Sequence, residues 1–122
     1  GIKKMARSAV TVTKMLLYNT TYDITPDACD LVNDHEIDAS EMAHDRLLIR
    51  VAGATTDMVM TIKAGAFSDA SLGDLAVTVE DTDIVCIVLE ASRFLQSDGK
   101  INIDLASEGA VTGATIEAYL LP

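Results

Sequence analysis

The segment LEASRFLQSDGKINIDL, Leu89–Leu105, decides the fold, because it places a turn signal in front of a clear strand pattern. Its second half, KINIDL (100–105), alternates apolar and polar residues with the two-residue period of a strand that buries one face. Asp98 and Gly99, just before it, are residues that tight hairpin turns prefer. We therefore expect SRFLQ (92–96) and KINIDL to be two strands of one β-hairpin.

Two charged residues open this segment. Glu90 ends one predicted strand and Arg93 begins the next, so we expect them to form an ion pair at a corner of the sheet. An exposed pair of this kind contributes only ~0–1 kcal/mol to stability. The charges in the segment therefore indicate sheet architecture and not a catalytic site.

The strand pattern recurs along the chain. Runs rich in Val, Ile, Leu, Met and Thr are separated by Gly, Asp, Ser and Thr, which is typical of an all-β sandwich or barrel. Further strands are predicted at SAVTVTKMLLY (8–18), DRLLIRVAG (45–53), DMVMTIKAG (57–65), LAVTVE (75–80), DIVCIVLE (83–90) and GATIEAYLL (113–121). The short ATT between the second and third of these runs favours a hairpin.

This spacing predicts an all-β fold, an antiparallel and jelly-roll-like β-sandwich with seven to nine strands and at most one short helical turn. A chain of 122 residues is long enough to bury a core of its own. Residues 1–8 are predicted to be a basic N-terminal arm, and residues 9–122 a single β-sandwich domain.

The acidic stretch 19–44 concentrates the residue types that bind metals. Its spacing matches neither an HExxH motif nor an EF-hand loop, so we expect a solvated loop with no metal and no cofactor. The stretch is also expected to hold one short strand or a helical turn, the latter beginning at Asp38 or Ser40. The weak candidates for a transition metal or Ca²⁺ are Asp34, His35, Glu36, Asp38 and His44.

The net charge of −10 is unevenly distributed. Residues 1–22 hold four bases and no acid, whereas residues 23–122 hold all 19 acids against five bases. An acidic body repels phosphate groups, which argues against nucleic acid as a partner. The basic arm is suited to an acidic surface on a neighbouring copy, although a solvated terminus fits the charges equally well.

Two apolar runs exceed what a single core can take. Met15, Leu16 and Leu17 are consecutive, as are Leu120 and Leu121, so both faces of each run are apolar. One face can enter the core, and the other requires a neighbour. We therefore predict self-association through an interface that includes Lys3, Lys4, Arg7, Met15, Leu16 and Leu17.

Nothing in the sequence points to an enzyme. The serines lie in no GxSxG setting, two histidines leave little material for a catalytic triad, and the glycines form no phosphate-binding loop. Cys29 and Cys86 are expected to be thiols and not a disulfide. No apolar run approaches the ~20 residues that a membrane-spanning helix needs, so no membrane partner is expected.

Five motifs stand out by their order: MARSAVTV (5–12), LLIRVAGATTDMVMTIKAG (47–65), LGDLAVTV (72–79), LEASRFLQSDGKINIDL (89–105) and GATIEAYLLP (113–122). Their order and spacing resemble a family of small structural proteins encoded beside the capsid genes of tailed bacteriophages and prophages. The resemblance covers residues 45–122 well and residues 5–14 loosely, and it leaves out the acidic stretch.

The resemblance implies a virion structural protein, in the first place a head decoration or head-fibre protein with a β-sandwich or jelly-roll fold. Such a protein binds the major capsid protein, commonly as a homotrimer, and is located in the phage head after synthesis in the bacterial cytoplasm. The resemblance brings no catalytic residues. The alternatives are a tail or neck virion protein and a Ca²⁺-dependent carbohydrate-binding β-sandwich.

Overall fold

The computed structural model describes residues 6–40 and 46–122, and strands dominate its secondary structure, so the all-β class is confirmed. The described ranges hold ten strands, more than the seven to nine predicted, because several are only two to four residues long. They are β1 (Ser8–Ala9), β2 (Val12–Lys14), β3 (Asp27–Ala28), β4 (His35–Asp38), β5 (Leu47–Ala52), β6 (Met58–Ile62), β7 (Leu75–Val79), β8 (Ile84–Leu89), β9 (Lys100–Ala106) and β10 (Thr115–Leu120).

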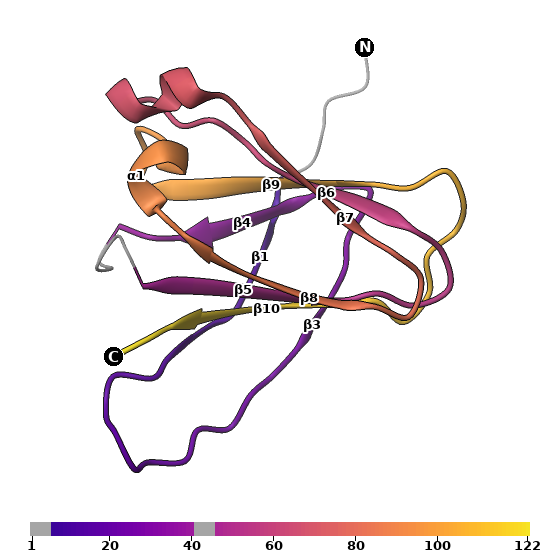
Figure 1. Ribbon diagram of the computed structural model, residues 1–122, viewed down its shortest axis with the longest axis horizontal. Helices are drawn as coiled ribbons and strands as arrows, with labels where there is room; N and C mark the ends of the chain where they lie inside the picture. Colours follow the sequence, from indigo (N-terminus) through magenta and orange to yellow (C-terminus); the bar gives the residue numbers. More distant parts are fainter. Residues whose placement is uncertain (1–5, 41–45) are drawn as a thin grey trace.

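The strands form two sheets that lie on either side of one hydrophobic core (Figure 1). Sheet one has the order β1-β4-β9-β6-β7, and sheet two has the order β2-β10-β5-β8 with β3 also paired to β10. Alternate residues of β5, β6 and β9 are buried, as the two-residue period requires. Sheet one contributes Ile37, Met60, Ile62, Ile101 and Ile103 to the core, and sheet two contributes Leu47, Ile49, Val51, Ile116 and Ala118.

The first predicted strand, 8–18, is divided between the two sheets. β1 pairs with β4 of sheet one, and β2 pairs with β10 of sheet two. Both pairings are parallel, so the expectation of purely antiparallel sheets was wrong for these two pairs. Val10 lies between the two strands and is buried in the core, because the chain passes over the open edge of the sandwich at this point.

The hairpin predicted for residues 45–65 was also wrong. β5 pairs with β8 and β10 in sheet two, whereas β6 pairs with β7 and β9 in sheet one. Both strands bury one face, and they do so from opposite sides of the same core. The short connection therefore carries the chain from one sheet to the other.

SRFLQ is not a strand, although the turn after it was correctly predicted. Its residues belong mainly to α1 (Ala91–Phe94), a single helical turn, and only Leu95 forms an isolated bridge to Ile101. A helical turn places Ala91 and Phe94 on one face, and both are buried. A strand would have pointed them in opposite directions.

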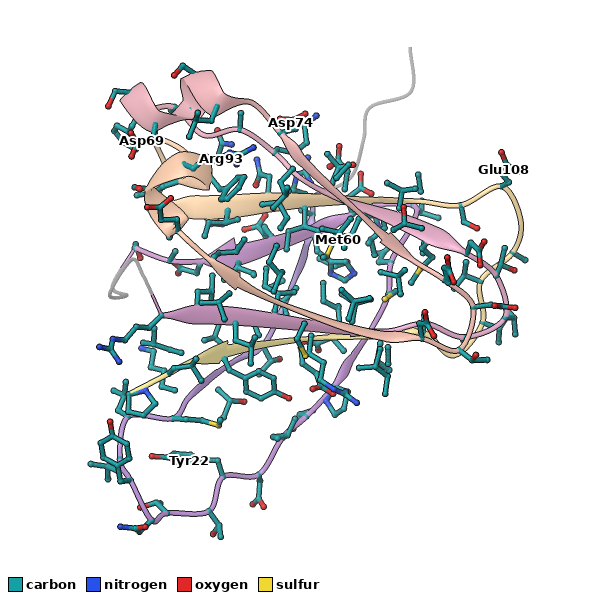
Figure 2. The ribbon with its side chains drawn as sticks, in the orientation of Figure 1. Tyr22, Met60, Asp69, Asp74, Arg93 and Glu108 are labelled. Atoms are coloured by element: carbon teal, nitrogen blue, oxygen red, sulfur yellow. The ribbon has the colours of Figure 1, made fainter. Side chains whose placement is uncertain are left out.

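A 3₁₀ helix, η1 (Ser68–Leu72), lies beside α1, so the described residues contain two helical turns where at most one was expected. Arg93 of α1 holds the two together. Its guanidinium donates to the carbonyls of Leu72, Gly73 and Asp74 at 3.3, 3.1 and 3.2 Å and lies over the Phe94 ring. Figure 2 shows Arg93 and Asp74 at this end of the molecule. The predicted Glu90–Arg93 ion pair is thus replaced by contacts to backbone carbonyls.

Candidate functional site

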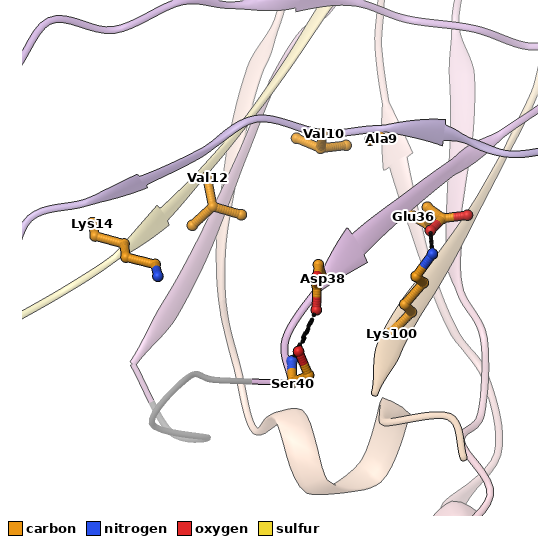
Figure 3. A pocket seen from close by; sticks show the side chains of 8 residues that line it. All are labelled: Ala9, Val10, Val12, Lys14, Glu36, Asp38, Ser40 and Lys100. Carbon is orange, nitrogen blue, oxygen red and sulfur yellow. Dashed lines mark hydrogen bonds and ion pairs between the residues drawn. The ribbon is translucent and has the colours of Figure 1, made fainter. Parts of the chain in front are cut away.

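A hollow of about 380 Å³ lies where the N-terminal segment crosses from sheet one to sheet two (Figure 3). Two lysines and two carboxylates from β2, β4 and β9 line it, together with a serine and small apolar residues. The lining residues are Ala9, Val10, Val12, Lys14, Glu36, Asp38, Ser40 and Lys100. We call this the crossover hollow. It contains two of the residues that the sequence marked as weak metal candidates.

Three of the charged groups of the crossover hollow have a partner among its lining residues. Lys100 Nζ lies 2.5 Å from Glu36 Oε2, and Ser40 Oγ donates to Asp38 Oδ1 at 2.7 Å. The hydrogen bond from Ser40 lowers the pKa of Asp38, and the partner Glu36 raises the pKa of Lys100. Asp38 and Lys100 are therefore charged near neutral pH, which suits a polar contact surface better than general acid–base chemistry.

Asp34 and His35 are buried, and both form hydrogen bonds with backbone groups of the chain. Asp34 is buried in the left-handed backbone region, and its Oδ1 accepts the Leu105 N–H at 2.9 Å. The buried His35 ring accepts the Asp30 N–H at Nε2, at 2.9 Å, and its Nδ1 lies 3.2 Å from the Ser8 carbonyl. Because Nε2 is the acceptor, the proton of the neutral ring is on Nδ1 and is donated to Ser8.

The strand geometry explains why these candidates do not gather around one point. In β4, His35 and Ile37 face the core, whereas Glu36 and Asp38 face outward. Within residues 6–40 and 46–122 no three metal-binding side chains come together in a way that could hold a metal ion. His44 lies outside the described residues, as does most of the helical turn predicted from Asp38 or Ser40.

The predicted interface residues have different surroundings. Lys3 and Lys4 lie outside the described residues. Arg7 contacts its own chain, because Nη1 lies 2.7 Å from Asp104 Oδ1 and donates to the carbonyls of His35 and Ile103 at 3.2 Å. Arg7 is thus bound to sheet one.

Met15, Leu16 and Leu17 begin the β2–β3 loop, residues 15–26, which stands away from both sheets in Figure 1. Met15 is half-buried, but Leu16 is 53% and Leu17 67% exposed, and the following Tyr18 is 77% exposed.

The loop is braced from within. The Tyr22 hydroxyl accepts the Leu17 N–H at 3.0 Å, and Figure 2 shows Tyr22 reaching into the interior of the loop. Thr20 Oγ1 donates to the Tyr18 carbonyl at 3.2 Å. The exposed apolar side chains are therefore carried on a structured projection.

Sequence reasoning missed a polar network on the outer face of sheet two. Arg50 Nη1 lies 3.1 Å from Glu117 Oε1, and the Tyr119 hydroxyl donates to Glu117 Oε2. Glu117 and Tyr119 are buried. The available signal was a single charge within an apolar run, in LLIRVA and again in TIEAYL, since such charges require a partner on a neighbouring strand.

Cys29 and Cys86 are both free cysteines, as predicted. Cys29 is half-buried, and desolvation raises the pKa of its thiol to about 11. Cys86 is exposed on β8.

Comparison of the chain with protein-family models, with curated proteins and with solved structures finds no match in any of the three. In the part of the chain that the structure describes, no helix has the length and apolarity needed to cross a membrane.

Proposed function

We propose that this chain is a structural protein of a phage or prophage virion, a head decoration or accessory protein that self-associates and binds the major capsid protein. The family resemblance of its five motifs supports this role. The proposal includes a jelly-roll-like relation of the two sheets, a homotrimeric state and location in the virion head.

The observation that carries the proposal is the exposed apolar surface of the β2–β3 loop. Leu16, Leu17, Tyr18 and Ile24 are all exposed on this projection. Apolar side chains gathered on a projection mark a site of protein–protein contact. A loop of this kind fits a shell protein, because it can enter a depression between capsid subunits while the sandwich stays rigid.

A second feature supports a binding role without catalysis. The crossover hollow presents paired charges, and its carboxylate–lysine and carboxylate–serine contacts leave Asp38 and Lys100 charged at neutral pH. Such groups suit recognition of a polar protein surface.

The test uses shells assembled from the major capsid protein encoded in the same phage or prophage. We expect saturable cosedimentation of the full chain with these shells. The double variant Leu16→Ser/Leu17→Ser should remain folded and lose most of this binding. The matched control is Phe67→Ser/Leu72→Ser, which removes two equally exposed apolar side chains from the region of η1. The control should bind as the unmodified chain does.

Two results would contradict the proposal. One is the absence of cosedimentation with shells when the purified chain is folded. The other is equal binding by the two double variants, which would remove the β2–β3 loop as the contact surface. Binding to purified tails, and not to shells, would instead place the protein in the tail or neck.

A further inference from the structure

β8 is an edge strand with an exposed apolar face. It is the last strand of sheet two among the described residues, so its side opposite β5 has no partner strand there. Its residues, IVCIVL, include no charge, proline or glycine. Ile84, Cys86 and Val88 point outward, and Ile84 is 58% and Val88 59% exposed.

Natural proteins protect an open edge with charges, prolines, bulges or a covering segment. None of the residue-based devices is present within β8. The apolar surface continues onto β5, where Leu48 lies opposite Val88 and Ala52 lies opposite Ile84. Between them, Arg50 is paired with Glu117, so the surface is close to electrically neutral.

The charges around this strip favour a second copy of the same chain in one orientation. Asp81 and Asp83 precede β8, so its start is acidic. At its other end the exposed Glu90 follows the strand, and the exposed Arg46 lies at the same end, because the next residue, Leu47, is the register partner of Leu89. That end is therefore close to neutral. An antiparallel twofold arrangement places the acidic start of each β8 beside the end that carries Arg46 in the other copy. A parallel arrangement would place acid beside acid.

The apolar row is also complementary to itself in that orientation. With Cys86 at the twofold axis, Ile84 lies opposite the second copy's Val88, and each Cys86 lies opposite the same residue. This is the reciprocal pattern that a twofold interface requires. Elsewhere, two chains of net charge −10 repel each other, so a neutral strip is where they can approach most closely.

We propose that β8 pairs antiparallel with β8 of a second copy, which joins sheet two of both copies into one continuous sheet. The proposal adds to the self-association in the proposed function but uses a different surface from the β2–β3 loop. A twofold contact cannot close a trimer. The pairing would therefore connect neighbouring oligomers, as a shell lattice requires.

The first test uses Cys86 as a reporter. In a Cys29→Ser background Cys86 is the only thiol. A short bismaleimide should cross-link this chain to a dimer at concentrations where sedimentation shows association. The comparison chain, Cys86→Ser with Cys29 retained, should not cross-link and should still associate. Association without cross-linking at Cys86 would overturn the pairing.

The second test blocks the edge. Val88→Lys should raise the dimer dissociation constant at least about tenfold, which corresponds to ~1.4 kcal/mol. The matched control is Val59→Lys on sheet one, also an exposed strand valine, at 40%, and it adds the same charge. Equal effects of the two substitutions would overturn the proposal. Circular dichroism should show both variants to be folded.

Salt and the loop variants separate this inference from the proposed function. Added salt should strengthen β8 pairing, because the repulsion that it screens between two chains of net charge −10 exceeds the attraction of Asp81 and Asp83 to Arg46. Leu16→Ser/Leu17→Ser should reduce shell binding and leave Cys86 cross-linking intact. Val88→Lys should reduce Cys86 cross-linking and leave shell binding intact. Weakening of the Cys86 cross-link by salt would contradict the pairing.

Discussion

His35 Nε2 accepts the backbone N–H of Asp30 at 2.9 Å, and this bond closes the loop that precedes β4. A protonated ring could not accept it. Burial is the main cause of the lowered pKa of His35, outweighing the hydrogen bond to Ser8 and the carboxylates of Asp30, Asp27 and Asp34. Arg7 donates to the His35 carbonyl and adds a positive charge nearby.

The first prediction is a loss of stability as the pH falls below the ordinary histidine pKa of 6.5. The unfolded chain then binds a proton that the folded chain excludes, so the free energy of unfolding falls by at most about 1.4 kcal/mol per pH unit. The loss ends at the folded pKa of His35. Urea denaturation at a series of pH values measures it.

His35→Gln should remove this pH dependence. If His35→Gln keeps the same slope between pH 6.5 and the folded pKa, another group is responsible.

Asp30 affects stability in a separate, more acidic pH range. The hydrogen bond from Ser8 helps to lower its pKa to about 2, so its contribution is present above the ordinary 3.8 and is lost as the pH falls further.

The second prediction concerns alkaline pH. Burial and the bond to Glu117 raise the pKa of Tyr119 to about 12 from its ordinary 10.0. A raised pKa means that the stabilising contribution is complete below pH 10.0 and is lost as the pH rises toward 12. Tyrosinate absorbance should show one late-titrating tyrosine. Tyr119→Phe should remove that phase, and Tyr18→Phe should not.

The third prediction is that Gly65→Ala is strongly destabilising. A Cβ at Gly65 would lie 2.3 Å from the Leu95 carbonyl oxygen and 2.7 Å from two further backbone atoms, which cannot rotate away. We expect a loss of about 1–3 kcal/mol or more, as for other overpacked sites. Gly109→Ala is the control, since its nearest contact is 3.4 Å from a Thr56 methyl. Chemical denaturation that gave equal losses would refute the close approach of α1.

The fourth prediction is that Arg93→Lys loosens η1. A lysine keeps the charge but cannot reach three carbonyls with a planar group, so we expect a loss of ~1–2 kcal/mol. Limited proteolysis should show faster cleavage within residues 66–74. Arg46→Lys is the control, because Arg46 is exposed and within the described residues its guanidinium donates only to the Pro122 carbonyl. If residues 66–74 are cleaved no faster in Arg93→Lys than in the unmodified chain, the hydrogen bonds from Arg93 to the three carbonyls do not stabilise η1.

The candidate site was only partly accessible from the sequence. The acidic stretch and the apolar run at Met15–Leu17 were visible as composition, and the exposed apolar loop follows from the latter. The crossover hollow was not visible, because it depends on Lys14 and Lys100, which are far apart in sequence, lying beside Glu36 and Asp38. The same holds for Arg50 and Glu117, which meet only through the register of β5 and β10.

What the sequence by itself determined is the all-β class and the inner face of most strands. Alternation in KINIDL and LLIRVA is a local property, because the side chains of an extended chain point to opposite sides in turn. The turn at Asp98-Gly99 is likewise local, and Gly99 adopts the positive φ of 83° that glycine tolerates best.

Only the tertiary structure decided which strands pair. The alternation of apolar and polar residues predicts that β5 and β6 each bury one face. The same alternation is expected whether the two strands lie side by side in one sheet or face each other across the core. The division of residues 8–14 between two sheets has the same cause, since Val10 gains burial only where both sheets already stand. The helical turn at Ala91–Phe94 is favoured because it buries both side chains at once. The free energy gained from this burial exists only when the rest of the core has formed around them.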